Sequence, residues 1–76
     1  MKQILELLIT NLVDDKNQIS IEEIIDGNNV EYKVKVSKDD MGKIIGKQGR
    51  VAKSIRTVMK SISAKDNKKV NIEFLD

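Results

Sequence analysis

The 76-residue sequence contains no cysteine, histidine, proline or tryptophan. Without cysteine or histidine, the chain has no thiol nucleophile, no Ser-His-Asp triad and no thiolate or imidazole ligand for a metal ion. We therefore expect a protein that is not an enzyme and that uses no metal, cofactor or small-molecule substrate. The absence of cysteine also excludes disulfides, and this favours a cytoplasmic protein.

Long hydrophobic runs are missing too. The longest uninterrupted apolar run covers three residues, 7–9, whereas a membrane-spanning helix needs about 20. The apolar stretch near the N-terminus contains Glu6 and is followed by no small-residue cleavage site, so we expect neither a signal peptide nor a membrane partner. Hydrophobic residues make up 39% and charged residues 34% of the chain, and this balance predicts one small globular domain over residues 1–76.

Acidic residues are absent from one long segment. Residues 41–65 contain seven basic residues and no acidic one, whereas residues 1–40 contain five basic and nine acidic residues. A segment of this kind is a candidate surface for a polyanion such as a nucleic-acid backbone. Charge alone leaves open the alternative that it is an ordinary solvated basic face.

Hydrophobic periodicity predicts an α+β domain with the order helix, strand, strand, helix, helix, strand. The connection from the second strand through two helices to the third strand is long enough for a right-handed parallel crossover. The second strand should therefore lie at the centre of a three-stranded mixed sheet, antiparallel to the first and parallel to the third, with all helices on one face. The expected ranges are 3–13, about 19–25, 30–36, 38–45, 50–64 and 69–75.

The apolar face of the first helix is wider than one small sheet needs. The excess indicates either deeper burial or a self-association surface, and deeper burial is the expectation. The core stripe consists of Leu5, Leu8, Ile9 and Leu12, and the additional apolar residues are Ile4, Leu7 and Val13.

The start of the second helix carries a capping signal. Ser37 followed by Asp40 matches the capping box, and this role is more common for Asp39 and Asp40 than acid–base chemistry or Mg²⁺ binding. Gly42, inside this helix, is explained equally well by close packing and by the approach of a ligand. Met41 and Met59 are expected in the core.

Two glycines, Gly46 and Gly49, separate the second and third helices. Gly46 can take the left-handed conformation that ends the shorter helix, and Gly49 lets the backbone turn into the longer one. The longer helix presents unpaired N–H groups at its start, where phosphate groups bind well. Nucleotide-binding glycine motifs follow a strand and do not fit here. A G-x-x-G by itself is more often an ordinary turn, but Ile44-Ile45 before it and the basic residues around it make the signal more specific.

In this context the sequence resembles the KH-domain family. The segment 40–50, Asp-Met-Gly-Lys-Ile-Ile-Gly-Lys-Gln-Gly-Arg, with Ala52 and Ile55 after it, is similar to the small stand-alone bacterial KH proteins of the KhpA type. The likeness covers the whole chain, and the element order resembles the type II KH fold. It implies a non-catalytic RNA-binding protein, an RNA chaperone or post-transcriptional regulator linked to cell elongation or division. It also implies pairing with itself or with a larger Jag-type KH protein.

The resemblance implies a phosphate clamp on single-stranded RNA at the G-x-x-G segment. Lys47 and Gln48 would face the phosphates, and Ile45 would help to floor the groove for the bases. The implied RNA-contact residues are Gly46, Lys47, Gln48, Gly49, Arg50, Lys53, Lys43 and Ile45.

Tyr32 and Phe74 are the only aromatic residues, and both fall on predicted core faces. We therefore expect no stacking of bases on aromatic rings, and weak binding that depends strongly on salt. Two alternatives remain: a protein-interaction module that dimerises through apolar helix faces, and a protein that binds single-stranded DNA.

Overall fold

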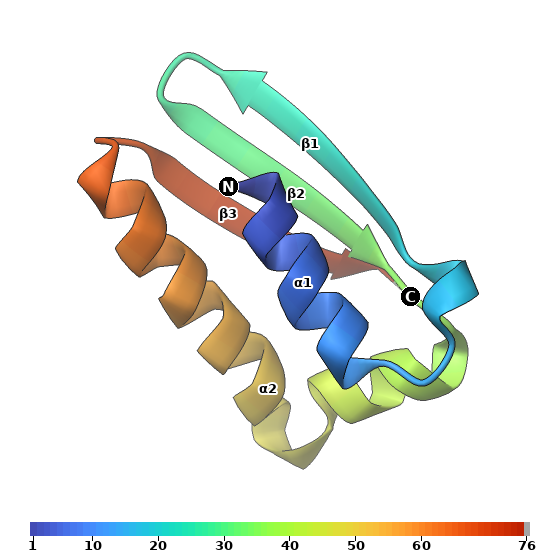
Figure 1. The fold of residues 1–76 in the computed structure, drawn as a ribbon. Coiled ribbons are helices and arrows are strands. Elements are labelled where there is room, and N and C mark those ends of the chain that lie inside the picture. Colours follow the sequence, from blue (N-terminus) through green and yellow to red (C-terminus); the bar gives the residue numbers. More distant parts are fainter. Residues whose placement is uncertain (76) are drawn as a thin grey trace.

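The computed structural model describes residues 1–75, with all side chains except that of Lys47; Asp76, the last residue of the predicted domain, lies outside the described part. Its elements follow the predicted order. A bend divides α2 into two helical halves (Figure 1), so the predicted pair of helices is present. The elements are α1 (Lys2–Leu12), the 3-10 turn η1 (Lys16–Gln18), β1 (Ser20–Asp26), β2 (Asn29–Lys35), α2 (Lys38–Lys65) and β3 (Lys69–Leu75).

The three strands form one mixed sheet with β2 at its centre. β2 pairs with β1 in antiparallel and with β3 in parallel orientation, so that Tyr32 lies beside Glu23 on one side and Ile72 on the other. Both helices cover the same face of this sheet (Figure 1). The predicted α+β topology is therefore confirmed.

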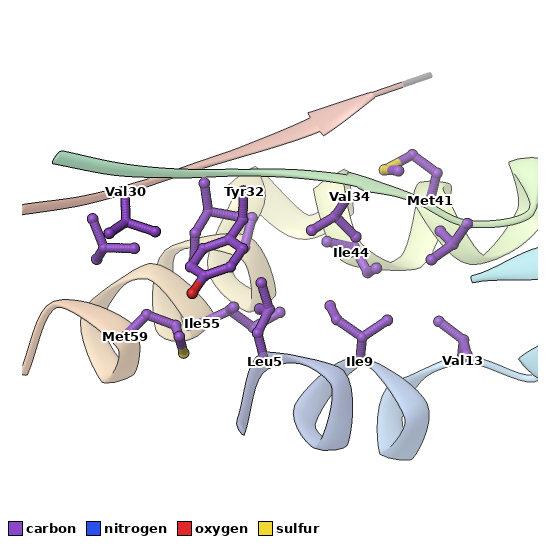
Figure 2. Packing of buried hydrophobic residues seen from close by; sticks show 14 residues of the cluster. Leu5, Ile9, Val13, Val30, Tyr32, Val34, Met41, Ile44, Ile55 and Met59 are labelled. Carbon is purple, nitrogen blue, oxygen red and sulfur yellow. The ribbon is translucent and has the colours of Figure 1, made fainter. Parts of the chain in front are cut away.

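The hydrophobic core lies between the sheet and the helical layer. Figure 2 shows Leu5 and Ile9 of α1 pointing toward the side chains of β2. Tyr32 is fully buried and its hydroxyl donates a hydrogen bond to Glu23 Oε2 at 2.6 Å. The buried residues, which include both methionines predicted for the core, are Leu5, Ile9, Val13, Val30, Tyr32, Val34, Val36, Met41, Ile44, Ala52, Ile55, Met59, Val70 and Ile72.

The apolar face of α1 is less deeply buried than predicted. Ile4 and Leu7 stay exposed, and Leu12, expected in the core stripe, is 43% exposed. Leu12 lines an open groove between α1 and the second half of α2, which leaves this flank of α1 uncovered. Val13 takes the core position instead, because the chain becomes extended there and turns the side chain inward.

The Asp40 carboxylate joins the start of α2 to the loop after α1. Ser37 accepts a hydrogen bond from the Asp40 N–H, and its hydroxyl donates to Asp40 Oδ2 at 2.8 Å, which confirms the helix cap. The carboxylate also accepts hydrogen bonds from the backbone N–H groups of Asp14 and Asp15, with N···O distances of 3.0 Å to Oδ1 and Oδ2 respectively. These N–H groups, followed by the Ser37 hydroxyl, lower the pKa of Asp40 to about 2. One buried side chain thus fixes the position from which α2 leaves the sheet.

Candidate functional site

The bend in α2 is made by two consecutive residues with left-handed backbone conformation. Gln48 has φ 63° and Gly49 has φ 69°. The prediction that Gly46 would adopt this conformation is wrong, because the first half of α2 continues through Gly46 and Lys47 before it turns. A left-handed residue is uncommon when it is not glycine, and this backbone conformation costs Gln48 about 1–2 kcal/mol.

The second half of α2 begins at this bend (Figure 1). A helix that starts again after two left-handed residues presents backbone N–H groups at its start. These groups and the helix dipole make the start of the second half favourable for an anion. The surrounding segment 41–65 contains no carboxylate that would compete for them.

Gly46 leaves helical backbone uncovered immediately before the bend. A Cβ atom built on Gly46 would meet no heavy atom of the described residues within 4 Å, and the same is true of Gly42. Close packing therefore does not explain Gly42, which excludes one of the two predicted interpretations. An alanine would favour the helix by about 1 kcal/mol at either position. The missing side chains make the backbone accessible to a ligand from outside.

Ile45 and Lys53 lie on the surface around the bend. Ile45 is 45% exposed, although Met41 and Ile44 of the same helical turn are buried. Lys53 is exposed one turn after the bend, and Arg50, also exposed, reaches the groove beside α1. The backbone of Lys47 lies within the bend, while its side chain is outside the described part. Apolar and cationic groups thus border the open backbone.

Lys43 has carboxylate partners within the fold. It forms an ion pair with Asp14 and approaches Asp40 Oδ1 at 3.7 Å. The Asp14 carboxylate raises the pKa of Lys43. Two residues along a helix are about 200° apart around its axis, so Lys43 and Ile45 point to opposite sides. Lys43 therefore stabilises the loop after α1, and its charge is already compensated.

Comparisons with known proteins identify the family of this chain. The family model described as KhpA/KhpB, KH domain, matches residues 2–74. The chain belongs to the KhpA/KhpB KH-domain family. It is similar to proteins named RNA-binding protein KhpA: 44% identical to that of Clostridium perfringens over 99% of this chain and 100% of the relative, 41% to that of Chlamydia trachomatis over 100% and 97%, and 37% to that of Listeria monocytogenes over 100% of both. No solved structure matches the chain with comparable significance.

In this KhpA/KhpB-family domain, Arg56 was not among the predicted RNA-contact residues. Its Nε donates a hydrogen bond to the Ile72 carbonyl oxygen at 3.2 Å, and its guanidinium carbon lies 5.3 Å from the centre of the Phe74 ring. Phe74 is only half-buried, so the predicted core position holds in part. The available sequence signal is the basic segment 41–65, which contains Arg56 and whose last helix packs beside β3.

A second feature of this family member is the apolar groove between α1 and the second half of α2. Its volume is about 380 Å³. Val58 on one wall is 42% exposed, and Leu7 outside the groove is 62% exposed. The lining residues are Leu8, Asn11, Leu12, Arg50, Val51, Ser54, Ile55 and Val58. Across residues 1–75, no helix is both long enough and apolar enough to cross a bilayer.

Proposed function

We propose that this chain is a non-catalytic RNA-binding protein that holds the phosphate backbone of single-stranded RNA at the bend formed by Gly46–Gly49. The observation that carries the proposal is the pair of left-handed residues, Gln48 and Gly49, at which α2 restarts within a segment that contains no carboxylate. The name of the relatives, RNA-binding protein KhpA, supports the same function.

The clamp works through backbone groups and charge. A phosphate oxygen accepts hydrogen bonds from N–H groups in the first turn of the second half of α2, where the helix dipole favours an anion. The missing side chain of Gly46 lets the sugar-phosphate chain approach the helix closely. Lys53 neutralises a neighbouring phosphate, and the exposed Ile45 side chain packs against a base. Such a clamp distinguishes few RNA sequences by itself, since its contacts are mainly to the sugar-phosphate backbone of the RNA.

The cellular role follows from the family resemblance. We propose that the protein acts in the cytoplasm as an RNA chaperone or post-transcriptional regulator linked to cell elongation or division. Single-stranded DNA is the alternative ligand, because backbone contacts at the bend do not require a 2′-hydroxyl.

A charge reversal at the bend tests the clamp. Lys47→Asp with Gln48→Asp should weaken binding of a short single-stranded RNA at least tenfold, because each lost charge-assisted hydrogen bond is worth about 1.5–3 kcal/mol. Aspartate tolerates the left-handed backbone at position 48, so the fold should persist. Fluorescence anisotropy measures the affinity, and a DNA oligonucleotide of the same sequence separates RNA from DNA binding.

The chain supplies a matched control. The dipeptide Lys-Gln also occurs at residues 2–3, in the first turn of α1 and away from the bend (Figure 1). Lys2→Asp with Gln3→Asp makes the same change in net charge, and acidic residues are favourable at the start of a helix. Equal loss of affinity in both variants, or no loss at the bend, would contradict the clamp.

Dimerisation through the apolar groove is a second candidate function. Exposed apolar residues from two helices, Leu12 and Val58 among them, line a single groove on the helical layer. Its occupant would be a second copy of this chain or a larger Jag-type KH protein. Val58→Asp should then convert a dimer into a monomer in light scattering, whereas Thr57→Asp, an exposed neighbour outside the groove, should not. A monomeric wild-type protein would exclude self-pairing.

A further inference from the structure

We propose that the outer edge of β1 (Ser20–Asp26) is a docking site for a basic, extended segment of another protein, which adds a fourth strand to the sheet. The proposal goes beyond RNA binding and concerns a surface away from the bend at Gly46–Gly49. Figure 1 shows β1 at the margin of the sheet opposite the second half of α2, with its hairpin end far from the bend.

The outer side of β1 is free to pair with a further strand. Each residue from Ser20 to Asp26 pairs with one residue of β2, and within residues 1–75 the backbone of β1 forms no hydrogen bond to the backbone of another element. Alternate N–H and C=O groups of an edge strand point outward and are available to an added strand. β3, the other edge strand, is packed beside α2 instead, where Arg56 donates a hydrogen bond to the Ile72 carbonyl oxygen.

β1 also lacks several features that keep an edge strand from pairing. It is seven residues long, contains neither lysine nor proline, and has no bulge between Ser20 and Asp26. Its apolar residues are poorly covered, because Ile25 is 60% exposed and Ile24 is exposed as well. Successive side chains of a strand point to opposite faces, so an added strand covers apolar surface on both faces of the sheet.

The charge of this strand determines what can pair with it. Residues 17–32 contain four acidic residues and no basic one, which repels RNA. Two β1 strands aligned antiparallel over their full length would place Glu23 opposite its own copy, and like charges directly opposite are destabilising. Glu22 and Asp26 flank Ile24 on one face of β1. The segment that fits therefore has lysine or arginine on either side of β-branched residues.

A heptapeptide of sequence Lys-Val-Val-Thr-Lys-Val-Thr, blocked at both ends, serves as the probe for this edge. Added antiparallel to β1, its first residue lies opposite Asp26 and its last opposite Ser20. The two lysines then face Asp26 and Glu22, and the valines face Ile25, Ile24 and Ile21. A second peptide, in which glutamate replaces both lysines, has the same strand preference but the opposite charge.

Fluorescence anisotropy of the labelled peptides at low salt tests the charge preference. Wild-type protein should bind the lysine peptide at least about fourfold more tightly than the glutamate peptide, because two cross-strand charge pairs change from attractive to repulsive. In Glu22→Gln with Asp26→Asn this preference should fall to less than about twofold. Glu6→Gln with Glu73→Gln removes the same charge from two other exposed positions and should keep the preference.

A third peptide separates strand pairing from simple attraction between charges. Proline at its third and fourth positions keeps both lysines but removes a donor that faces β1, because neighbouring N–H groups of a strand point to opposite sides. This peptide should lose most of the affinity. In an NMR titration with the lysine peptide, the amides of Ser20–Asp26 should shift and those of Gln48–Ala52 should not. No charge preference in the wild type, retained affinity of the proline peptide, or shifts outside β1 and its neighbour β2 would overturn the docking site. None of these outcomes bears on the RNA clamp at the bend.

Discussion

Replacing Gly46 by alanine should stabilise the protein and damage its RNA binding at the same time. Gly46 lies inside the helical run of α2 without a left-handed backbone, and a Cβ atom there would meet nothing within 4 Å in the described structure. Alanine is favoured over glycine in a helix by about 1 kcal/mol. In a domain of this size that corresponds to a rise in melting temperature of about 4–8 °C.

The same methyl group would stand where the sugar-phosphate chain has to approach. We expect the affinity for single-stranded RNA to fall on the order of tenfold, the equivalent of one lost charge-assisted hydrogen bond. Gly49→Ala should behave differently, because Gly49 has φ 69° and a left-handed alanine costs about 1–2 kcal/mol. One substitution type thus has opposite effects on stability at two glycines three residues apart.

Thermal unfolding and fluorescence anisotropy together check this reasoning. Gly42→Ala is the stability control, because Gly42 is also helical with open surroundings and should give the same rise in melting temperature. A Gly46→Ala variant that melts at a lower temperature would refute the helical conformation at Gly46. A variant that melts higher but binds RNA as tightly as the wild type would refute the approach of the backbone at that position.

Three further predictions concern stability and binding. Native contacts lower the pKa of Asp40 from the ordinary 3.8 to about 2, so its contribution to stability is complete above about pH 4 and is lost as the pH falls toward 2; acid titration of Asp40→Asn should lack this component. Gln48→Gly relieves a left-handed residue that costs about 1–2 kcal/mol against an entropic cost of about 0.5–1 kcal/mol, so chemical denaturation should show equal or slightly higher stability. Contact with three or four phosphates should give a plot of log affinity against log salt with a slope of about −2 to −3, and a flat plot would contradict an electrostatic clamp.

The fold could be predicted from the sequence because its strongest signals are local. Perfect alternation from Val30 to Val36 defines β2, and the capping pair at Ser37 and Asp40 marks the start of α2. The length of the crossover then places β2 at the centre of the sheet. The position of the left-handed residues was predicted less well, because glycine preference favours Gly46, whereas the structure has Gln48 and Gly49 in this conformation.

Contacts between distant residues account for the other differences. The sequence shows Lys43 only as one more cation near the glycines. Its ion pair with Asp14, which is far away in the sequence, appears only in the fold. In the sequence Arg56 is one of several basic residues of the same helix. Its contacts with Phe74 and Ile72 depend on the packing of β3 against α2. Helical periodicity marks Leu12 as apolar but does not show that the groove leaves it 43% exposed.

The most direct test of the clamp is an NMR titration that follows backbone amides while single-stranded RNA is added. The amides from Gln48 to Ala52, at the bend and in the first turn after it, should shift most and saturate together. The amides of α1 between Lys2 and Leu12 should move little. Large shifts in α1 or on the open face of the sheet, with an unchanged bend, would contradict a phosphate clamp at Gly46–Gly49.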